Sequence, residues 1–242
     1  MRKRAFAFQV PRVVFVLPVF TTLLSGCAHQ GITERNPEKL LSAACLPGAS
    51  TVSVSGSAWL KAASTEASGQ FPAVVQASRP DRLRLEVTNL LGGTEAVITV
   101  KDQRYSISGK SAKSETGEGS WGGIPLFWAT ELFLGKIPCP SQAARQDAAL
   151  KVGEHGDLTV ETRASLSREP ELFHYRFRNW GGKPWPESLH WERKNPPVIS
   201  VDFSFDDPED PSGSPKKWEA KSQRGEVKVR WKDRVLKGYE SR

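Results

Sequence analysis

Residues 82–101 read RLRLEVTNLLGGTEAVITVK, and this stretch decides the fold class of the chain. In its first arm Leu83, Leu85 and Val87 alternate with charged side chains, which is the period of two that a half-buried strand shows. A turn rich in Asn and Gly leads to a second apolar arm at 96–100. Because one face of such a hairpin must contact water, the pattern predicts an antiparallel sheet that is covered on one side.

The same alternation recurs before and after this hairpin, and an antiparallel sheet of that length should curl. Further segments of this kind lie at 52–60, 74–75, 105–107, 158–162, 172–177, 188–191, 198–205 and 226–231. We expect a mainly β protein with two or three helices: an incomplete, half-open antiparallel β-barrel with a helical lid. Residues 108–123 are expected to form a mobile loop, and the acidic stretch 206–215 an exposed one.

Two segments carry helix signals. Asn36 is a good N-cap, Pro37 suits the first helical position, and the pair Pro47-Gly48 ends the segment. A second apolar face with a period of 3.6 runs through 124–132 and precedes Gly135. These helices are expected to cover the concave side of the sheet and to leave an apolar interior beneath them.

The N-terminus has the composition of an export signal. Basic residues at 2–4 precede an apolar run at 13–24, which is too short to span a bilayer as a helix. The run ends in Leu24-Ser25-Gly26-Cys27, which resembles the lipobox of bacterial lipoproteins. This resemblance implies a signal peptide at 1–26 and lipid attachment at Cys27. The alternative is an ordinary secretory signal that contains a cysteine. The polar residues that follow Cys27 favour a tether at 27–36, and the rest of the chain, 37–242, is expected to form a single half-barrel domain.

Charge and cysteine content narrow the function classes. Four of the 34 Lys and Arg residues precede Cys27 and no acidic residue does, so the formal charge falls from +7 to +3 after cleavage. The remaining charges alternate in sign, and nucleic acid is not indicated as a partner. Cys45 and Cys139 form an even pair in an oxidising compartment, which favours a disulfide over a metal or redox pair.

No arrangement of residues predicts catalysis or a cofactor. His29, His155, His174 and His190 are scattered, and none has the spacing of a zinc site. The acidic residues of 206–215 are interrupted by prolines, which favours a solvated loop over a calcium site. We expect no metal, no cofactor and no enzymatic activity.

Leu90 and Leu91 are unusual because they occupy a hairpin tip, where polar residues are the norm. They could fold back onto the core, or they could remain exposed and insert into lipid or a hydrophobic partner. The eight tryptophans leave a similar choice open, since they suit both a filled core and a cavity for acyl chains.

Two motifs resemble the outer-membrane lipoprotein receptors of the LolA/LolB-like family. The segment Val87-Thr88-Asn89-Leu90-Leu91-Gly92-Gly93-Thr94-Glu95 is similar to the family's leucine-tipped hairpin. The segment 124–138, which ends in Leu-Gly-Lys-Ile-Pro, is similar to its short helix. The resemblance covers about residues 36–140. Leu90 stands where the family usually has proline, and Cys45 and Cys139 are additions to its pattern.

The resemblance implies that the concave face accepts the acyl chains of lipoproteins from a periplasmic LolA-like carrier and inserts them into the outer membrane. It also implies anchoring at the periplasmic face of that membrane and a role for Leu91 in release. Expected lining residues are Trp59, Leu83, Leu85, Val87, Ile98, Phe127, Trp128 and Leu132. The alternative is an adaptor lipoprotein with a filled barrel, in which Trp59 and Trp128 share one packed neighbourhood. A periplasmic hydrolase is the third hypothesis, and the sequence favours it least.

Overall fold

The computed structural model describes residues 32–64, 68–110, 114–121, 123–165, 169–194, 198–208 and 213–238. The predicted export signal, Cys27 and the first residues of the predicted tether lie outside the described residues. Within the described residues, no helix combines the length and apolarity needed to cross a membrane.

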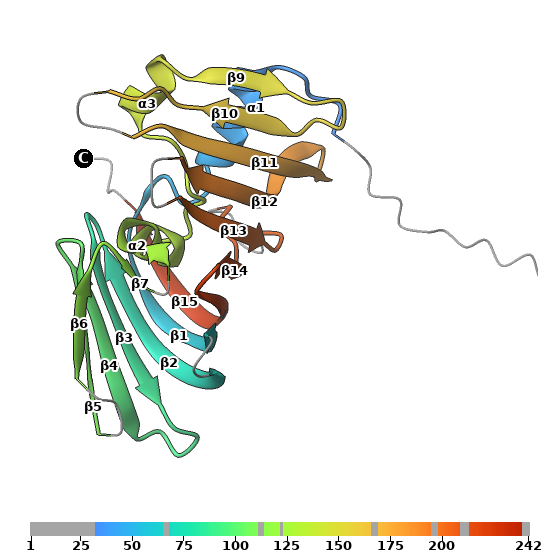
Figure 1. Cartoon of the computed structure of the whole chain (residues 1–242). Coiled ribbons are helices and arrows are strands. Elements are labelled where there is room, and N and C mark those ends of the chain that lie inside the picture. The colour runs from blue at the N-terminus through green and yellow to red at the C-terminus, as the bar shows by residue number, and fades with distance from the viewer. Residues whose placement is uncertain are drawn as a thin grey trace, which may run out of the picture.

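One antiparallel sheet of thirteen strands dominates the structure (Figure 1). Its strand order is β6-β5-β4-β3-β2-β1-β15-β14-β13-β12-β11-β10-β9, so β1 pairs with β15 and both ends of the chain's β region meet in the middle. The sheet curves without closing, with β6 and β9 at its two edges, as the predicted half-open barrel requires. The strands are β1 Thr51–Ser64, β2 Ser68–Ser78, β3 Arg82–Thr88, β4 Thr94–Lys101, β5 Arg104–Gly109, β6 Glu115–Glu118, β9 Ala149–Val152, β10 Leu158–Glu161, β11 Glu171–Trp180, β12 Lys183–Arg193, β13 Ile199–Phe205, β14 Lys217–Ser222 and β15 Gly225–Gly238.

Three helices and a small separate hairpin complete the described fold. The helices are α1 Pro37–Cys45, α2 Leu126–Phe133 and α3 Gln142–Gln146, and the hairpin pairs β7 Ser120–Trp121 with β8 Ile124–Pro125. The α1 start is confirmed, because the Asn36 side chain accepts a hydrogen bond from the Lys39 amide at 2.9 Å. Helix α2 begins within the predicted segment 124–132 and ends one residue beyond it. Helix α1 packs against β9, β10 and β12, and α2 contacts β2 and β3.

The prediction of a mobile loop at 108–123 is wrong. Strand β6 lies within it and pairs with β5, and the β7–β8 hairpin begins there as well. Strands β9 and β14 were also missed. Each has at most two inward apolar residues, so neither shows an alternation long enough to recognise in the sequence.

The acidic stretch 206–215 is held at both of its described ends. Pro208 and Pro215 form an isolated antiparallel bridge, and Asp207 forms an ion pair with Arg178 of β11 at 2.7 Å. Ser214 is buried. Residues 209–212 lie outside the described residues.

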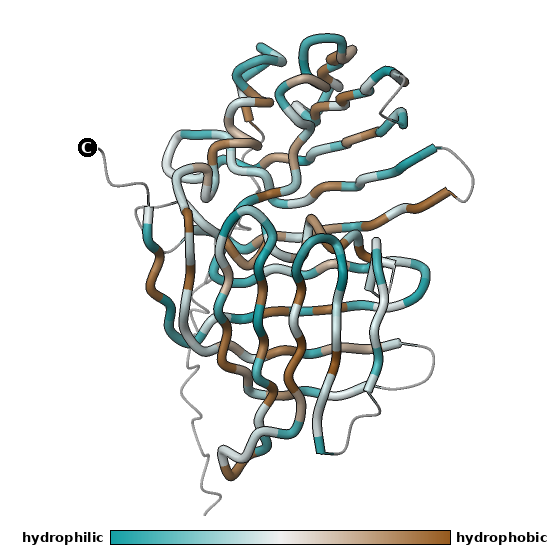
Figure 2. Tube along the Cα trace, turned by 90° about the vertical axis from the view of Figure 1, so that its left-hand side faces the viewer, coloured by the Kyte–Doolittle hydropathy of each residue, from teal (hydrophilic) through white to brown (hydrophobic). Residues whose placement is uncertain are grey.

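A continuous apolar surface covers the concave side of the sheet. In most of the longer strands alternate residues are buried, and Figure 2 shows hydrophobic positions recurring in step across neighbouring strands. In β3 these are Leu83, Leu85 and Val87, whose exposed fractions do not exceed 8%. The strand register therefore brings the inward residues of all thirteen strands to one face, which positions the candidate site described next.

Candidate functional site

The part of the concave face under α2 is filled by aromatic rings. Trp128 of α2 lies 6.4 Å from both Phe173 of β11 and Trp191 of β12, measured between ring centroids. Phe133, at the end of the same helix, contacts Trp218 and Trp231 at 5.3 and 6.1 Å. These contacts are edge-to-face, the geometry that aromatic quadrupoles prefer. The predicted apolar interior beneath the helices is therefore occupied by side chains at this position.

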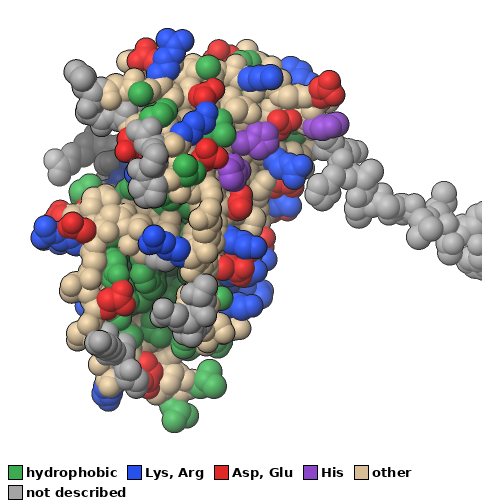
Figure 3. Space-filling model, in the orientation of Figure 1, with side chains coloured by type: hydrophobic (Ala, Val, Ile, Leu, Met, Phe, Trp, Pro, Cys, Tyr) green, Lys and Arg blue, Asp and Glu red, His purple; other side chains and the backbone are tan. Residues whose placement is uncertain are grey.

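The half of the sheet formed by β1 to β6 has smaller inward residues and is more open. Figure 3 shows hydrophobic side chains lining a hollow below α2, over the lower part of the sheet. Phe71 faces inward because it shares the face of buried Ala73, and 41% of its surface is exposed. Ala96 and Ile107 also face inward and are half-buried. On the covering side, Trp121, Ile124 and Phe127 are half-buried and pack against the same core.

The structure brings together seven of the eight residues predicted to line an acyl cavity. Leu83, Leu85, Val87 and Ile98 lie on the concave face, and Trp128, Leu132 and the half-buried Phe127 come from α2. Trp59 was predicted wrongly: it is 37% exposed, and its neighbours Ala58 and Leu60 are the buried residues. In a strand, alternate residues face opposite sides, so Trp59 lies on the convex face. It shares no packed neighbourhood with Trp128.

Leu90 and Leu91 do not fold back onto the core. Their exposed fractions are 85% and 97%, the two highest among the large hydrophobic residues of the described structure. They occupy the turn between β3 and β4, and Figure 2 shows this hydrophobic tip at the lower end of the sheet. Two adjacent large apolar side chains exposed to this extent form a candidate contact for an apolar partner.

Asn89 holds this tip in a defined conformation. Its side-chain oxygen accepts hydrogen bonds from the amides of Leu91 at 3.0 Å and Gly93 at 2.9 Å. Its side-chain amide donates to Glu95 at 2.7 Å, and its backbone N–H donates to the Gly93 carbonyl at 2.9 Å. The exposed leucines are thus presented on an ordered turn, which reduces the entropy lost when they bind.

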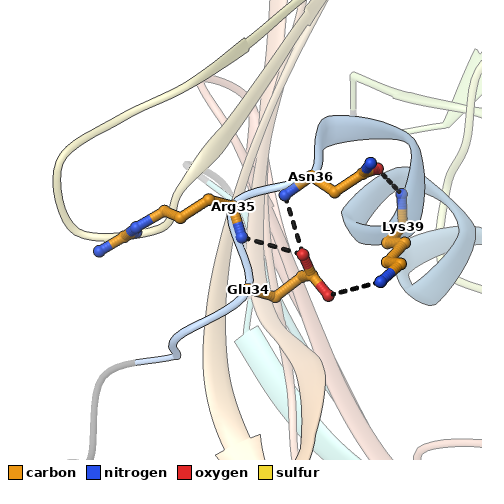
Figure 4. Close-up of polar contacts among 4 residues, drawn as sticks. All are labelled: Glu34, Arg35, Asn36 and Lys39. Atoms are coloured by element: carbon orange, nitrogen blue, oxygen red, sulfur yellow. Dashed lines mark hydrogen bonds and ion pairs between the residues drawn. The ribbon is translucent and has the colours of Figure 1, made fainter.

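The chain just before α1 is docked on the domain. Ile32 is buried, and a Cβ at Gly156 would lie 2.6 Å from its side chain, so the two residues are in close contact. Glu34 accepts hydrogen bonds from the amides of Arg35 and Asn36 and pairs with Lys39 (Figure 4). These bonds lower the pKa of the Glu34 carboxyl, and the hydrogen bond from the Asn36 amide has the largest effect. Residues 32–36, expected to belong to the tether, are therefore fixed to the β9–β10 end of the sheet.

Covalent and close backbone contacts hold the helical cover in place. Cys45 at the end of α1 forms a disulfide with Cys139, with a Cα–Cα distance of 5.7 Å. Gly48, with φ of +62°, lies so close to the Gly135 backbone that a Cβ would be 2.6 Å from its carbonyl carbon. The hydroxyl of buried Tyr175 donates to the Pro138 carbonyl at 2.8 Å, and burial raises its pKa. The segment that follows α2 is therefore tied both to α1 and to the sheet.

The titratable groups of the described residues are spread over both faces of the sheet. No group of three His, Cys, Asp or Glu side chains in the described structure could hold a metal ion. His174 contacts Thr159, and His190 lies 2.7 Å from Asp202, both on the solvated face of the sheet. On the concave side, Tyr105 donates to Glu115 at 2.5 Å, and this bond raises the pKa of the phenol.

These features define a class of structure: an open antiparallel half-barrel with a clamped helical cover, a partly open apolar concave face and an exposed leucine hairpin. No protein-family model matches the chain, and no curated protein gives a significant match.

Solved structures with a similar arrangement of strands and helices include the following three bacterial proteins. A LolA superfamily protein from Nitrosomonas europaea aligns with a TM-score of 0.47 and 10% identity, covering 86% of this chain and 96% of that chain. An outer membrane lipoprotein-sorting protein domain from Vibrio parahaemolyticus gives a TM-score of 0.42 and 7% identity, covering 78% and 88%. A DUF1329 family protein from Desulfovibrio piger gives 0.48 and 6%, covering 80% and 89%. At these TM-scores and identities the similarity concerns only the arrangement of strands and helices.

Proposed function

We propose that this protein is a lipoprotein receptor that acts without catalysis at the periplasmic face of the outer membrane. Its concave face accepts the acyl chains of a lipoprotein from a soluble LolA-like carrier, and its leucine hairpin directs their insertion into the bilayer. Lipid attached to Cys27 anchors the receptor itself.

One observation carries this proposal: a partly open apolar face and an exposed apolar tip belong to the same strands. β3 and β4 contribute Leu85 and Ile98 to the concave face and end in the hairpin that presents Leu91. An acyl chain held on the concave face therefore lies on the strands whose turn contacts lipid. The lipobox at Cys27 and the family motifs at 87–95 and 124–138 support the same function.

The transfer needs no nucleotide or catalytic residue. Moving a methylene group from water into an apolar environment gains about 0.8 kcal/mol, so cargo moves forward when each successive environment covers its chains better. A half-open face suits an intermediate position, because it covers acyl chains only in part. Burying one leucine contributes about 1.5–3 kcal/mol, which is enough for transient contact with a bilayer and too little for permanent attachment.

The decisive experiment replaces the leucine at the tip. Leu91→Glu should abolish transfer of an acylated lipoprotein from a LolA-like carrier to vesicles while the variant retains wild-type stability. Leu46→Glu is the matched control, because Leu46 is 73% exposed and lies next to α1, away from the hairpin. Transfer by Leu91→Glu at the wild-type rate would refute the receptor function.

A second function, an adaptor that binds a protein, is favoured by the ring-filled space under α2. In that case the concave face would carry no lipid. Mass spectrometry of the purified mature protein separates the two functions: co-purifying acyl lipid supports the receptor, and its consistent absence supports the adaptor.

A further inference from the structure

We propose a second membrane-contact surface, the outer β1–β2 patch, formed by Trp59, Lys61, Pro72, Val74 and Arg230 on the convex face. Its ligand is the headgroup region of anionic phospholipids. This inference rests on the membrane anchoring in the proposed function, and it adds a second contact to the one made by the leucine hairpin.

The patch presents apolar side chains where a sheet of this kind normally presents polar ones. Trp59 is 37% exposed and Val74 is 44% exposed, both on the face opposite the core. Trp59 stands directly across from Pro72 in β2, and Val74 stands across from Ser57, two residues before Trp59 in β1. The three side chains therefore form one contiguous apolar area on the solvent side of the sheet.

Cations border this apolar area. Arg230 of β15 is the other cross-strand neighbour of Trp59, and Lys61 lies in the next row on the same face. Neither has an ion-pair partner within the described part of the chain. Lys228, opposite Lys61, instead forms ion pairs with Glu219 and Glu226 at 2.9 and 3.0 Å. The nearby carboxylate of Asp233 accepts a hydrogen bond from the Ser57 hydroxyl. An exposed indole flanked by uncompensated cations fits a membrane interface with anionic lipids.

The patch is continuous with the leucine hairpin. The Thr88 hydroxyl donates a hydrogen bond to the Pro72 carbonyl at 3.3 Å, and Thr88 is the residue before the hairpin turn. In an antiparallel meander β1 and β3 run in the same direction, so their last residues lie at the same end of the sheet (Figure 1). Trp59 pairs with Pro72 and the next residue, Ala73, pairs with Val87, so Trp59 is level with the end of β3, from which the leucine hairpin starts. When the tip enters a bilayer, a tilt toward the convex side brings the patch onto the headgroups.

The test uses the intact lipidated protein anchored in vesicles of phosphatidylethanolamine and phosphatidylglycerol. Trp59→p-benzoylphenylalanine should form photo-adducts with phospholipid. Trp180→p-benzoylphenylalanine is the matched control, because Trp180 is also an exposed tryptophan, with 42% exposure, at the end of β11. Reversing both cations with Lys61→Glu and Arg230→Glu should lower the adduct yield at position 59 on the order of ten-fold, and added salt should lower it too.

Equal yields of lipid adduct at positions 59 and 180 would overturn the proposed membrane contact of the patch. A protein adduct in place of a lipid adduct at position 59 would overturn it as well. The outcome is independent of the hairpin experiment. If Leu91→Glu blocks transfer while position 59 gives no lipid adduct, the receptor function stands and the patch falls. If position 59 reacts with lipid while Leu91→Glu transfers normally, the patch stands and the receptor function falls.

Discussion

The indole of Trp128 in α2 lies edge-on to the indole of Trp191 in β12, with ring centroids 6.4 Å apart and planes at 81°. This contact joins the helical cover to the half of the sheet that contains β11 and β12. Phe173 approaches Trp128 at the same centroid distance, so the helix is seated between two strands. The contact divides the concave face into a filled aromatic half and a more open aliphatic half.

Trp128→Ala should destabilise the protein by about 3–5 kcal/mol, since it leaves a large cavity in a packed aromatic cluster. Trp59→Ala is the control and should cost much less, because Trp59 lies on the convex surface. Urea denaturation of both variants measures the difference. Equal losses would mean that α2 does not depend on this contact.

Reduction of the Cys45–Cys139 disulfide should lower the stability of the folded state. The two cysteines are 94 residues apart, and a crosslink closing a loop of that size contributes about 4–5 kcal/mol in the chain-entropy model. The denaturation midpoint of the wild type should therefore fall when dithiothreitol is added. A Cys45→Ser/Cys139→Ser double variant should start at the lower midpoint and not respond to the reductant.

Phe71→Asp should weaken binding of a fluorescent fatty acid in the absence of membranes, because it places a charge at the open part of the concave face. Val74→Asp is the matched control: it lies on the same strand with similar exposure and faces the other side. A fluorescence titration of each variant provides the measurement. If Val74→Asp weakens binding of the fluorescent fatty acid as strongly as Phe71→Asp does, the binding site is not the concave face.

Asn89→Ala should loosen the leucine tip without unfolding the sheet, since it removes the acceptor for the Leu91 and Gly93 amides. Hydrogen exchange at those two amides should accelerate, while exchange in β3 stays slow. Transfer to vesicles should be slower than in the wild type and faster than in Leu91→Glu. Unchanged amide exchange would show that the turn is ordered by its backbone alone.

The docking of residues 32–36 should weaken in acid. The folded-state pKa of Glu34 is lowered from 4.5, so its contribution is complete above that value and is lost as the pH falls through the folded-state pKa. The protection of the Arg35 and Asn36 amides against hydrogen exchange, relative to unstructured amides at the same pH, should therefore fall below about pH 4.5. In Glu34→Gln this protection should already be lower at neutral pH and should not fall further in acid.

Local signals in the sequence were sufficient for several elements. The alternation at 82–88 predicted β3 because inward and outward residues differ in polarity. Asn36 and Pro37 predicted the start of α1 because capping depends on neighbouring residues only. Trp59 was misplaced because its size suggested the core, whereas the alternation with Ala58 and Leu60 assigns it to the convex face.

The sequence by itself determined the strand periods, the capped first helix and the apolar residues at the hairpin tip, because these depend on contacts within a few residues. The tertiary structure decided the pairing of β1 with β15, the disulfide between Cys45 and Cys139, and the division of the concave face into two halves. These features join residues that are distant along the chain, and only the packing of the whole sheet and its helices brings them together.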